Sequence, residues 1–146
     1  MPGPGTRGAG RGLQIPQALH DEMIAHCQSR YPKEACGYLA RAHDGEAAVQ
    51  VYPMANVEDS PIGYAMDPQE QLQVDKLMRQ RGQRMLAIYH SHTASEAYPS
   101  PVDVQLAISP DDSYVLVSLE DRDRPVCRSY RIDGGRIEEE PLSVVS

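Results

Sequence analysis

The stretch Met85-Leu86-Ala87-Ile88-Tyr89 is a continuous apolar run that leads directly into His90-Ser91-His92. A run of this kind is typical of a central strand that is covered on both faces of its sheet. Residues two apart in a strand point to the same face, so the two imidazoles can reach one point in space. Taken alone, this pattern does not distinguish a metal site from two polar residues at the end of a strand.

The segments on either side of this strand alternate between helical and extended patterns. Helices are expected over residues 16–30, 68–81 and 101–108. Strands are expected over residues 35–40, 47–54, 114–119 and 127–132, and the tail 136–146 is expected to add one last strand or cover segment. This alternation predicts an α/β domain with a mixed sheet flanked by helices.

The domain organisation follows from length and local composition. A chain of 146 residues fits one domain with a core of its own. Residues 1–12 read MPGPGTRGAGRG and are dominated by glycine, proline and arginine, which predicts a disordered leader. We therefore expect one folded domain over residues 13–146.

Charge and cysteine usage exclude several classes of function. The net charge is −7, and only Arg7 and Arg11 give a locally basic stretch, so we expect no nucleic acid and no anionic membrane as a partner. Cys27, Cys36 and Cys127 are odd in number and irregularly spaced, which is typical of free thiols in a reducing compartment. With no apolar run of membrane-spanning length, the chain is expected to be cytoplasmic.

The segment Ser100-Pro101-Val102-Asp103 allows two interpretations that can both hold. A serine followed three residues later by an acidic residue, with proline between them, is a pattern that starts helices. Side chains in the first turn of a helix tilt back toward its N-terminus, so Asp103 would also face whatever precedes the helix. If the loop 93–99 folds that turn over the strand end, the carboxylate meets His90 and His92.

Zinc is the metal that this donor set favours. Catalytic zinc commonly takes three protein ligands from His and Asp or Glu and leaves the fourth position for water. Hydrolysis also needs a base to move the proton of that water, and Glu34 precedes the apolar strand that begins at Ala35. Sequence spacing does not place Glu34 beside His90, and taken alone the residue favours the simpler interpretation of a solvated glutamate.

Together these residues resemble the signature of the JAMM/MPN+ (Mov34) zinc metallopeptidases. The resemblance lies in His90-Ser91-His92, then seven residues, Ser100, two residues and Asp103, with Glu34 upstream. It implies a cytidine-deaminase-like α/β fold, with one zinc ion held by His90, His92 and Asp103. It further implies that Glu34 is the general base and later the acid, and that Ser100 acts at the oxyanion or the bound water.

The small bacterial members of that family are the most similar in three segments. These are Glu34-Ala35-Cys36-Gly37, Asn56 through Tyr64, and Tyr89 through Ser100. The resemblance implies that the substrate is a ubiquitin-like sulfur-carrier protein with a Gly-Gly C-terminus, from which the enzyme hydrolyses a terminal cysteine in cysteine biosynthesis. The loops 55–67 and 93–99 are then the candidate groove walls, with Tyr64 and Tyr98 either packing locally or contacting the carrier tail.

Two alternatives remain open at this stage. One is an isopeptidase that removes ubiquitin-like modifiers from lysine side chains, although the chain lacks a long insertion to grip the modifier. The other is a non-catalytic MPN scaffold module, which the presence of His90, His92, Asp103, Ser100 and Glu34 disfavours. A free cysteine such as Cys36 is usually buried, so we expect it in the core and not in the site.

Overall fold

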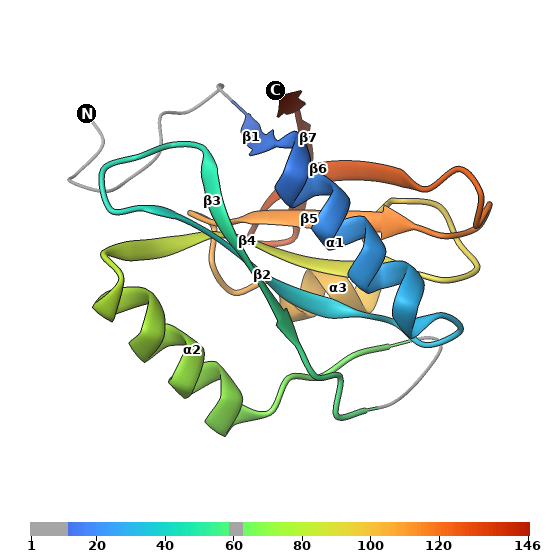
Figure 1. Ribbon diagram of the computed structural model, residues 1–146. Helices are drawn as coiled ribbons and strands as arrows, with labels where there is room; N and C mark the ends of the chain where they lie inside the picture. The colour runs from blue at the N-terminus through green and yellow to red at the C-terminus, as the bar shows by residue number, and fades with distance from the viewer. Residues whose placement is uncertain (1–11, 59–62) are drawn as a thin grey trace.

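The computed structural model describes residues 12–58 and 63–146, which form an α/β domain (Figure 1). The expected leader therefore lies, except for Gly12, outside the described residues, as do positions 59–62 of the expected loop 55–67. The elements, in chain order, are β1 (Leu13–Pro16), α1 (Gln17–Arg30), β2 (Cys36–Ala42), β3 (Ala48–Met54), α2 (Pro68–Gln80), β4 (Gln83–His92), α3 (Pro101–Leu106), β5 (Ser113–Ser118), β6 (Val126–Asp133), β7 (Arg136–Glu140) and β8 (Leu142–Val145).

Six of the strands form one mixed sheet in the order β3-β2-β4-β5-β6-β7. The neighbours β4 and β5 are parallel, and every other neighbouring pair in this sheet is antiparallel. A parallel pair needs a crossover connection, and here the crossover contains α3. The chain therefore runs from the end of β4 into the segment that contains α3. The mixed sheet agrees with the expected α/β class.

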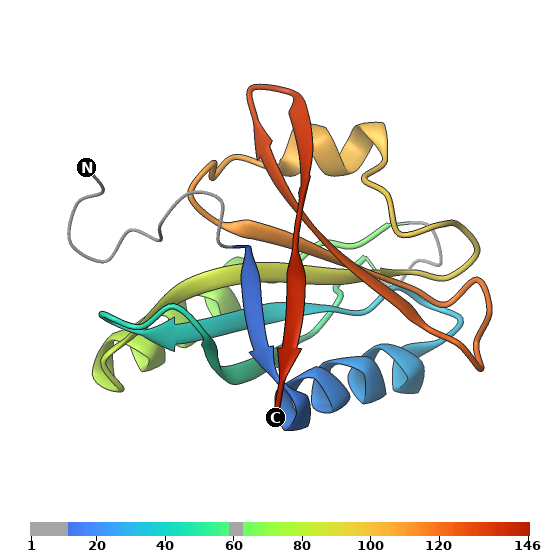
Figure 2. The ribbon, with the colours of Figure 1, turned by 90° about the horizontal axis from the view of Figure 1, so that it is seen from above.

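Helices cover both faces of the sheet (Figures 1 and 2). On one face, Met23 and Cys27 of α1 pack with Tyr89 of β4 and Val117 of β5. On the opposite face, α2 contributes Met78 to one cluster and α3 contributes partly buried Val104 to another. Because β4 and β5 are covered on both sides, their apolar runs are continuous, as expected for central strands. None of the helices in the described part of the chain is long and apolar enough to cross a bilayer.

The helix expected over residues 101–108 ends earlier, at Leu106. Its C-cap Ala107 has an extended ψ of 90°. The hydroxyl of Tyr114 accepts a hydrogen bond from the amide of Ser109 and donates one to its carbonyl, each at 3.0 Å. These bonds occupy backbone groups that a continued helix would need, and the residue before Pro110 also avoids helical angles.

The two ends of the described domain pair with each other. The strand β1 lies parallel to β8, with Leu13 opposite Leu142, and Figure 2 shows the two strands side by side. The tail therefore forms two strands, β7 and β8, instead of the single strand or cover segment expected for it. Local sequence does not predict β1, because its partner strand in the described part of the chain, β8, lies at the other end of the domain.

One close approach between β2 and β4 requires a glycine. Gly37 is paired with Tyr89, and a Cβ atom built on Gly37 would lie 2.4 Å from atoms of the Tyr89 ring. The ring has little room to move, because Tyr89 is fully buried and its hydroxyl lies 2.7 Å from Nδ1 of His26. The glycine at this position is therefore explained by packing between the two strands.

We expect Gly37→Ala to lower the free energy of unfolding by about 1–3 kcal/mol, because the new methyl group overpacks a rigid contact. Urea denaturation of a double-mutant cycle measures the effect. In a Tyr89→Leu background the obstructing ring atoms are gone, so the same substitution should cost less than half as much. Equal costs in both backgrounds would contradict the packing explanation.

Candidate metal centre and catalytic groove

The C-terminal end of β4 presents two buried imidazoles on the same face. His90 and His92 are 5% and 6% exposed, and their Nε2 atoms lie 3.2 Å apart. Ser91 lies between them in sequence and is fully buried. The alternation of a strand therefore brings the two predicted histidines together, as expected.

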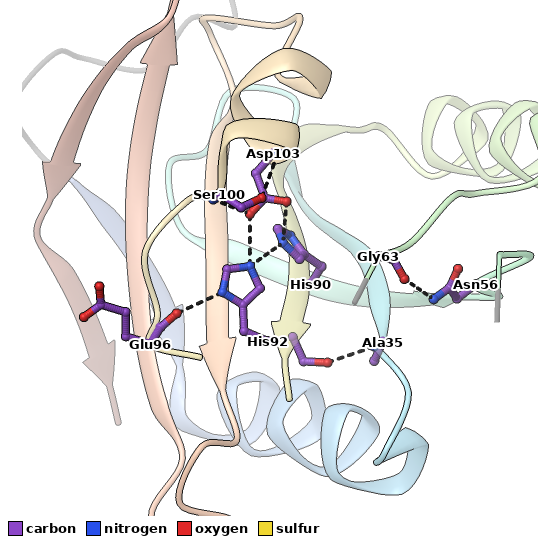
Figure 3. A network of polar contacts seen from close by, with 9 residues as sticks. Ala35, Asn56, Gly63, His90, His92, Glu96, Ser100 and Asp103 are labelled. Carbon is purple, nitrogen blue, oxygen red and sulfur yellow. Dashed lines mark hydrogen bonds and ion pairs between the residues drawn. The ribbon is translucent and has the colours of Figure 1, made fainter. Parts of the chain in front are cut away.

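Asp103 joins them from the first turn of α3 (Figure 3). Its Oδ1 lies 3.1 Å from Nε2 of His90, and its Oδ2 lies 3.0 Å from Nε2 of His92. The expected capping box is also present, because the amide of Asp103 donates to Oγ of Ser100 and the amide of Ser100 donates to Oδ2 of Asp103. The carboxylate thus starts the helix and faces both histidines, and the cap fixes its orientation.

The hydrogen bonds around His92 make this cluster suited to a cation. Nδ1 of His92 lies 2.9 Å from the carbonyl oxygen of Glu96, which accepts and cannot donate, so Nδ1 carries the proton. The neutral ring then has its lone pair on Nε2, facing Oδ2 of Asp103 and Nε2 of His90. One candidate ligand atom from each of the three residues lies within 4.8 Å of the other two. Converging lone pairs of this kind are stabilised by a metal ion, and the donor set fits zinc.

The pKa shifts of His90 and Asp103 agree with metal binding. Burial lowers the pKa of His90, which favours the neutral ring that binds metals. Burial alone would raise the pKa of Asp103, but the close contacts of its carboxyl with the rings of His90 and His92 outweigh burial and hold this pKa far below its usual range. Asp103 is therefore a carboxylate near neutral pH.

The antiparallel pairing of β2 with β4 brings Glu34 to this end of the sheet. Cys36 is opposite His90, so the residues that precede Cys36 run alongside Ser91 and His92. The amide of Ala35 donates to Oγ of Ser91 at 2.8 Å, and the amide of Ser91 donates to the carbonyl of Ala35 at 3.0 Å. Glu34 is 6% exposed, and burial raises the pKa of its carboxyl to about 7. A group with this pKa can both accept and return a proton near neutral pH.

A groove of about 730 Å³ runs past Glu34, His92, Ser100 and Asp103. Its further walls come from both of the loops that the sequence singled out: Glu58, Gly63, Tyr64 and Ala65 on one side, and Thr93, Ala94 and Ser95 on the other. Val102 and Leu106 of α3 also line it. Four predicted site residues, Glu34, His92, Ser100 and Asp103, therefore line a space large enough for an extended peptide. His90 instead lines a smaller adjacent pocket with Asp103 and Tyr64.

The other predicted positions, Tyr64, Tyr98 and Cys36, lie in three different surroundings. Tyr64 stacks on His90, with ring centroids 4.6 Å apart and an interplanar angle of 29°. Tyr98 instead packs edge-on against Tyr130, with centroids 5.6 Å apart. Cys36 is buried among the residues that pack under α2, as expected for a core thiol, and burial raises its pKa to about 12.

Two residues near the site were not assigned a role from sequence. Ser91 fixes the backbone beside Glu34, as described above. Asn56 is 7% exposed, and its Nδ2 donates to the carbonyl of Glu34 at 2.9 Å. The position of Ser91 between the two histidines was a usable signal, because it must face away from them. Asn56 carried no such signal, because its partners other than the nearby amide of Glu58 are backbone atoms of Glu34, Gly63 and Ala65, which lie further away in sequence.

Comparisons with known sequences agree on one family. The family model described as prokaryotic homologues of the JAB domain matches residues 16–133. The CysO-cysteine peptidase of Mycobacterium tuberculosis is 47% identical over 133 residues, which cover 91% of each chain. A probable TtuB-protein conjugate cleaving protease of Thermus thermophilus is 38% identical over 96 residues, which cover 65% of this chain and 63% of that protein.

Solved structures share the fold. A protein from Desulfitobacterium hafniense, determined in solution, is 38% identical with a TM-score of 0.82 and covers 91% of this chain and 92% of its own. A JAB1/MPN domain protein from Archaeoglobus fulgidus has a TM-score of 0.62 at 18% identity and covers 92% of this chain and 100% of its own. The sequence resemblance to the JAMM/MPN+ proteins is thereby confirmed, and the chain belongs to the family of prokaryotic homologues of the JAB domain.

Proposed function

We propose that the chain is a zinc metallopeptidase that hydrolyses the amide bond at the C-terminus of a ubiquitin-like sulfur-carrier protein and releases cysteine. The observation that carries this proposal is the convergence of His90, His92 and Asp103 beside a groove that His92, Asp103 and Glu34 line. The relative from Mycobacterium tuberculosis, named for a cysteine conjugate of CysO, supports the substrate class. The proposal assigns the activity to one domain over residues 13–146.

In this proposal His90, His92 and Asp103 hold one zinc ion. When bound, zinc lowers the pKa of a water molecule and polarises the carbonyl of the scissile bond. The protein's own contribution is to fix the donors: Glu96 holds the tautomer of His92 through its carbonyl, and the capping box holds Asp103. Donors fixed in this way need little reorganisation when the metal binds.

Glu34 and Ser100 supply the remaining groups. Glu34 takes a proton from the attacking water and returns it to the leaving amine, for which its raised pKa is suited. Oγ of Ser100 accepts the hydrogen bond of the helix cap, so its own proton is available to donate to the carbonyl oxygen as that oxygen gains negative charge. Each residue has one defined task in the amide hydrolysis.

The groove suits an extended carrier tail. A flexible tail can lie against the segment 63–65 and form main-chain hydrogen bonds of the kind that extended peptides use at sheet edges. Terminal glycines without side chains allow the scissile bond to approach the buried ligands closely. The Gly-Gly terminus expected of the carrier therefore suits a scissile bond placed beside the buried His92.

We place the reaction in the cytoplasm, where the free thiols of Cys27, Cys36 and Cys127 remain reduced.

An isopeptidase acting on lysine conjugates is the second candidate, and the name of the relative from Thermus thermophilus favours it. The two functions share the metal site and differ in the leaving amine. A scaffold role without catalysis leaves the convergence of donors and the proximity of Glu34 without a purpose.

The function is tested with a ubiquitin-like sulfur carrier whose C-terminus is extended by one cysteine. We expect the zinc-loaded protein to remove that cysteine, which intact-mass spectrometry of the carrier detects, and a zinc chelator to stop the reaction. The same carrier linked to a lysine side chain serves as the competing substrate. Faster cleavage of the lysine conjugate would replace the cysteine-releasing function with the isopeptidase function, and cleavage that persists in chelator would exclude a metallopeptidase.

We expect His92→Ala to abolish zinc binding, because it removes one of three protein ligands from the site. The loss of affinity should exceed the about 10- to 100-fold that changes around the ligands cause. Elemental analysis after dialysis measures zinc per chain, with His43→Ala as a control because the ring of His43 is exposed and contacts the adjacent Asp44. A full complement of zinc in His92→Ala would remove His92 from the ligand set.

We expect Glu34→Gln to keep its zinc and to lose turnover by about 10²- to 10⁴-fold, because an amide cannot accept the proton. The matched control is Glu96→Gln, which neutralises an exposed carboxylate on the neighbouring loop and leaves the carbonyl that holds His92. Cleavage of the carrier substrate under saturating conditions gives kcat for each variant. Turnover of Glu34→Gln at the rate of the unmodified protein would exclude Glu34 as the proton-transfer group.

A further inference from the structure

The side chain of Asn56 is the centre of a hydrogen-bond network beside the site. Asn56 is the only asparagine in the chain, follows β3 and is 7% exposed. Its Nδ2 donates to the carbonyls of Glu34 at 2.9 Å and Gly63 at 3.0 Å. Its Oδ1 accepts from the amides of Glu58 and Ala65, each at 3.0 Å. An amide side chain offers two donors and two acceptor sites, so all of its capacity is used by backbone atoms.

These four bonds join the backbone of Glu34 to one wall of the groove. Gly63 and Ala65 flank Tyr64, whose ring stacks on the candidate ligand His90 at 4.6 Å. The backbone bond from Val57 to the carbonyl of Ala65, at 2.8 Å, strengthens the same segment. Figure 3 shows Asn56 directed toward Gly63 on the side of His90 opposite Glu96. One side chain thus links the backbone of Glu34 to the wall that packs on His90.

Glu34 is consequently held from both directions. Ser91 fixes the following residue, Ala35, from the strand β4, and Asn56 fixes the carbonyl of Glu34 from the segment after β3. The Ser91 contact belongs to regular pairing between β2 and β4, which the sheet would largely maintain on its own. The bond from Asn56 comes from outside the sheet pairing, so it controls how the residue before the strand is turned.

We propose that Asn56 is a positioning residue, which holds Glu34 and the Tyr64 segment in one arrangement around the metal site. Its kinetic consequence rests on the proposed function, whereas the arrangement itself does not. Proton transfer requires the carboxyl within hydrogen-bond reach of its partner, and a displacement of about 1 Å can cost about 100-fold in rate. Asn56 acts on the reaction through Glu34 and does not touch the substrate.

The informative substitution is Asn56→Asp, which keeps Oδ1 and replaces the donating Nδ2 with an acceptor. That oxygen would then face the carbonyls of Glu34 and Gly63 and repel both. A second variant, Asn56→Ser, is neutral and separates the loss of the bonds from the added charge. The control is Tyr52→Phe, which removes a hydroxyl bonded to Gln50 and Gln83 at the opposite end of β4.

We expect both Asn56 variants to retain zinc and to lose about 10- to 100-fold in kcat, with a smaller change in KM, while Tyr52→Phe retains its kcat. The decisive comparison adds each Asn56 variant to Glu34→Gln in single-turnover reactions. If Asn56 acts through Glu34, the double variants should be no slower than Glu34→Gln alone. Full additivity would show a general structural effect and overturn the positioning role.

A second measurement is independent of activity. The ring protons of His90 lie against the Tyr64 ring, so their NMR chemical shifts report the stack. In zinc-loaded Asn56→Ser these shifts should move toward those of Tyr64→Leu. Unchanged shifts, or Asn56 variants as active as the unmodified protein, would overturn the inference. If the shifts move in Asn56→Ser but the unmodified protein does not cleave the carrier, the positioning role is retained and the proposed function is rejected.

Discussion

The arrangement of the site depends on the meeting of two imidazoles and one carboxylate at the end of a buried strand. Nε2 of His92 is directed at its neighbours because Nδ1 is committed to the carbonyl of Glu96. Asp103 is directed at the same point because its carboxylate also caps α3. The crossover from β4 to β5 must therefore carry a loop and a helix start whose backbone groups serve the site as well as the fold. A cation at this point would stabilise the cluster of side chains and the start of α3 that carries Asp103.

The remaining groups are arranged around that point by backbone pairing. Antiparallel pairing of β2 with β4 brings Glu34 to the end of β4, and it requires a glycine at position 37 to make room for Tyr89. Burial then raises the pKa of Glu34 toward neutrality, which a surface carboxylate would not reach. The packing between the two strands and the position of the group proposed for proton transfer thus depend on the same register.

Much of this could be predicted from residue patterns. The apolar run before His90, the alternation of His90 and His92, and the cap at Ser100 each obey local rules, and the structure agrees with all of them. The proximity of Glu34 to His92 came only from resemblance, because register between distant strands is not encoded locally. The pairing of β1 with β8 and the contacts of Asn56 were missed for the same reason. Of the two interpretations left open for Tyr98, the structure shows local packing, with its ring edge-on against Tyr130.

X-ray absorption spectroscopy at the zinc edge of the zinc-loaded protein tests the central claim most directly, because it identifies the donor atoms without assuming a substrate. We expect a shell of nitrogen and oxygen donors at about 2.0–2.2 Å from the zinc, with the outer scattering of two imidazole rings. A sulfur shell at about 2.3 Å would assign the metal to Cys27, Cys36 or Cys127 and contradict a site formed by His90, His92 and Asp103.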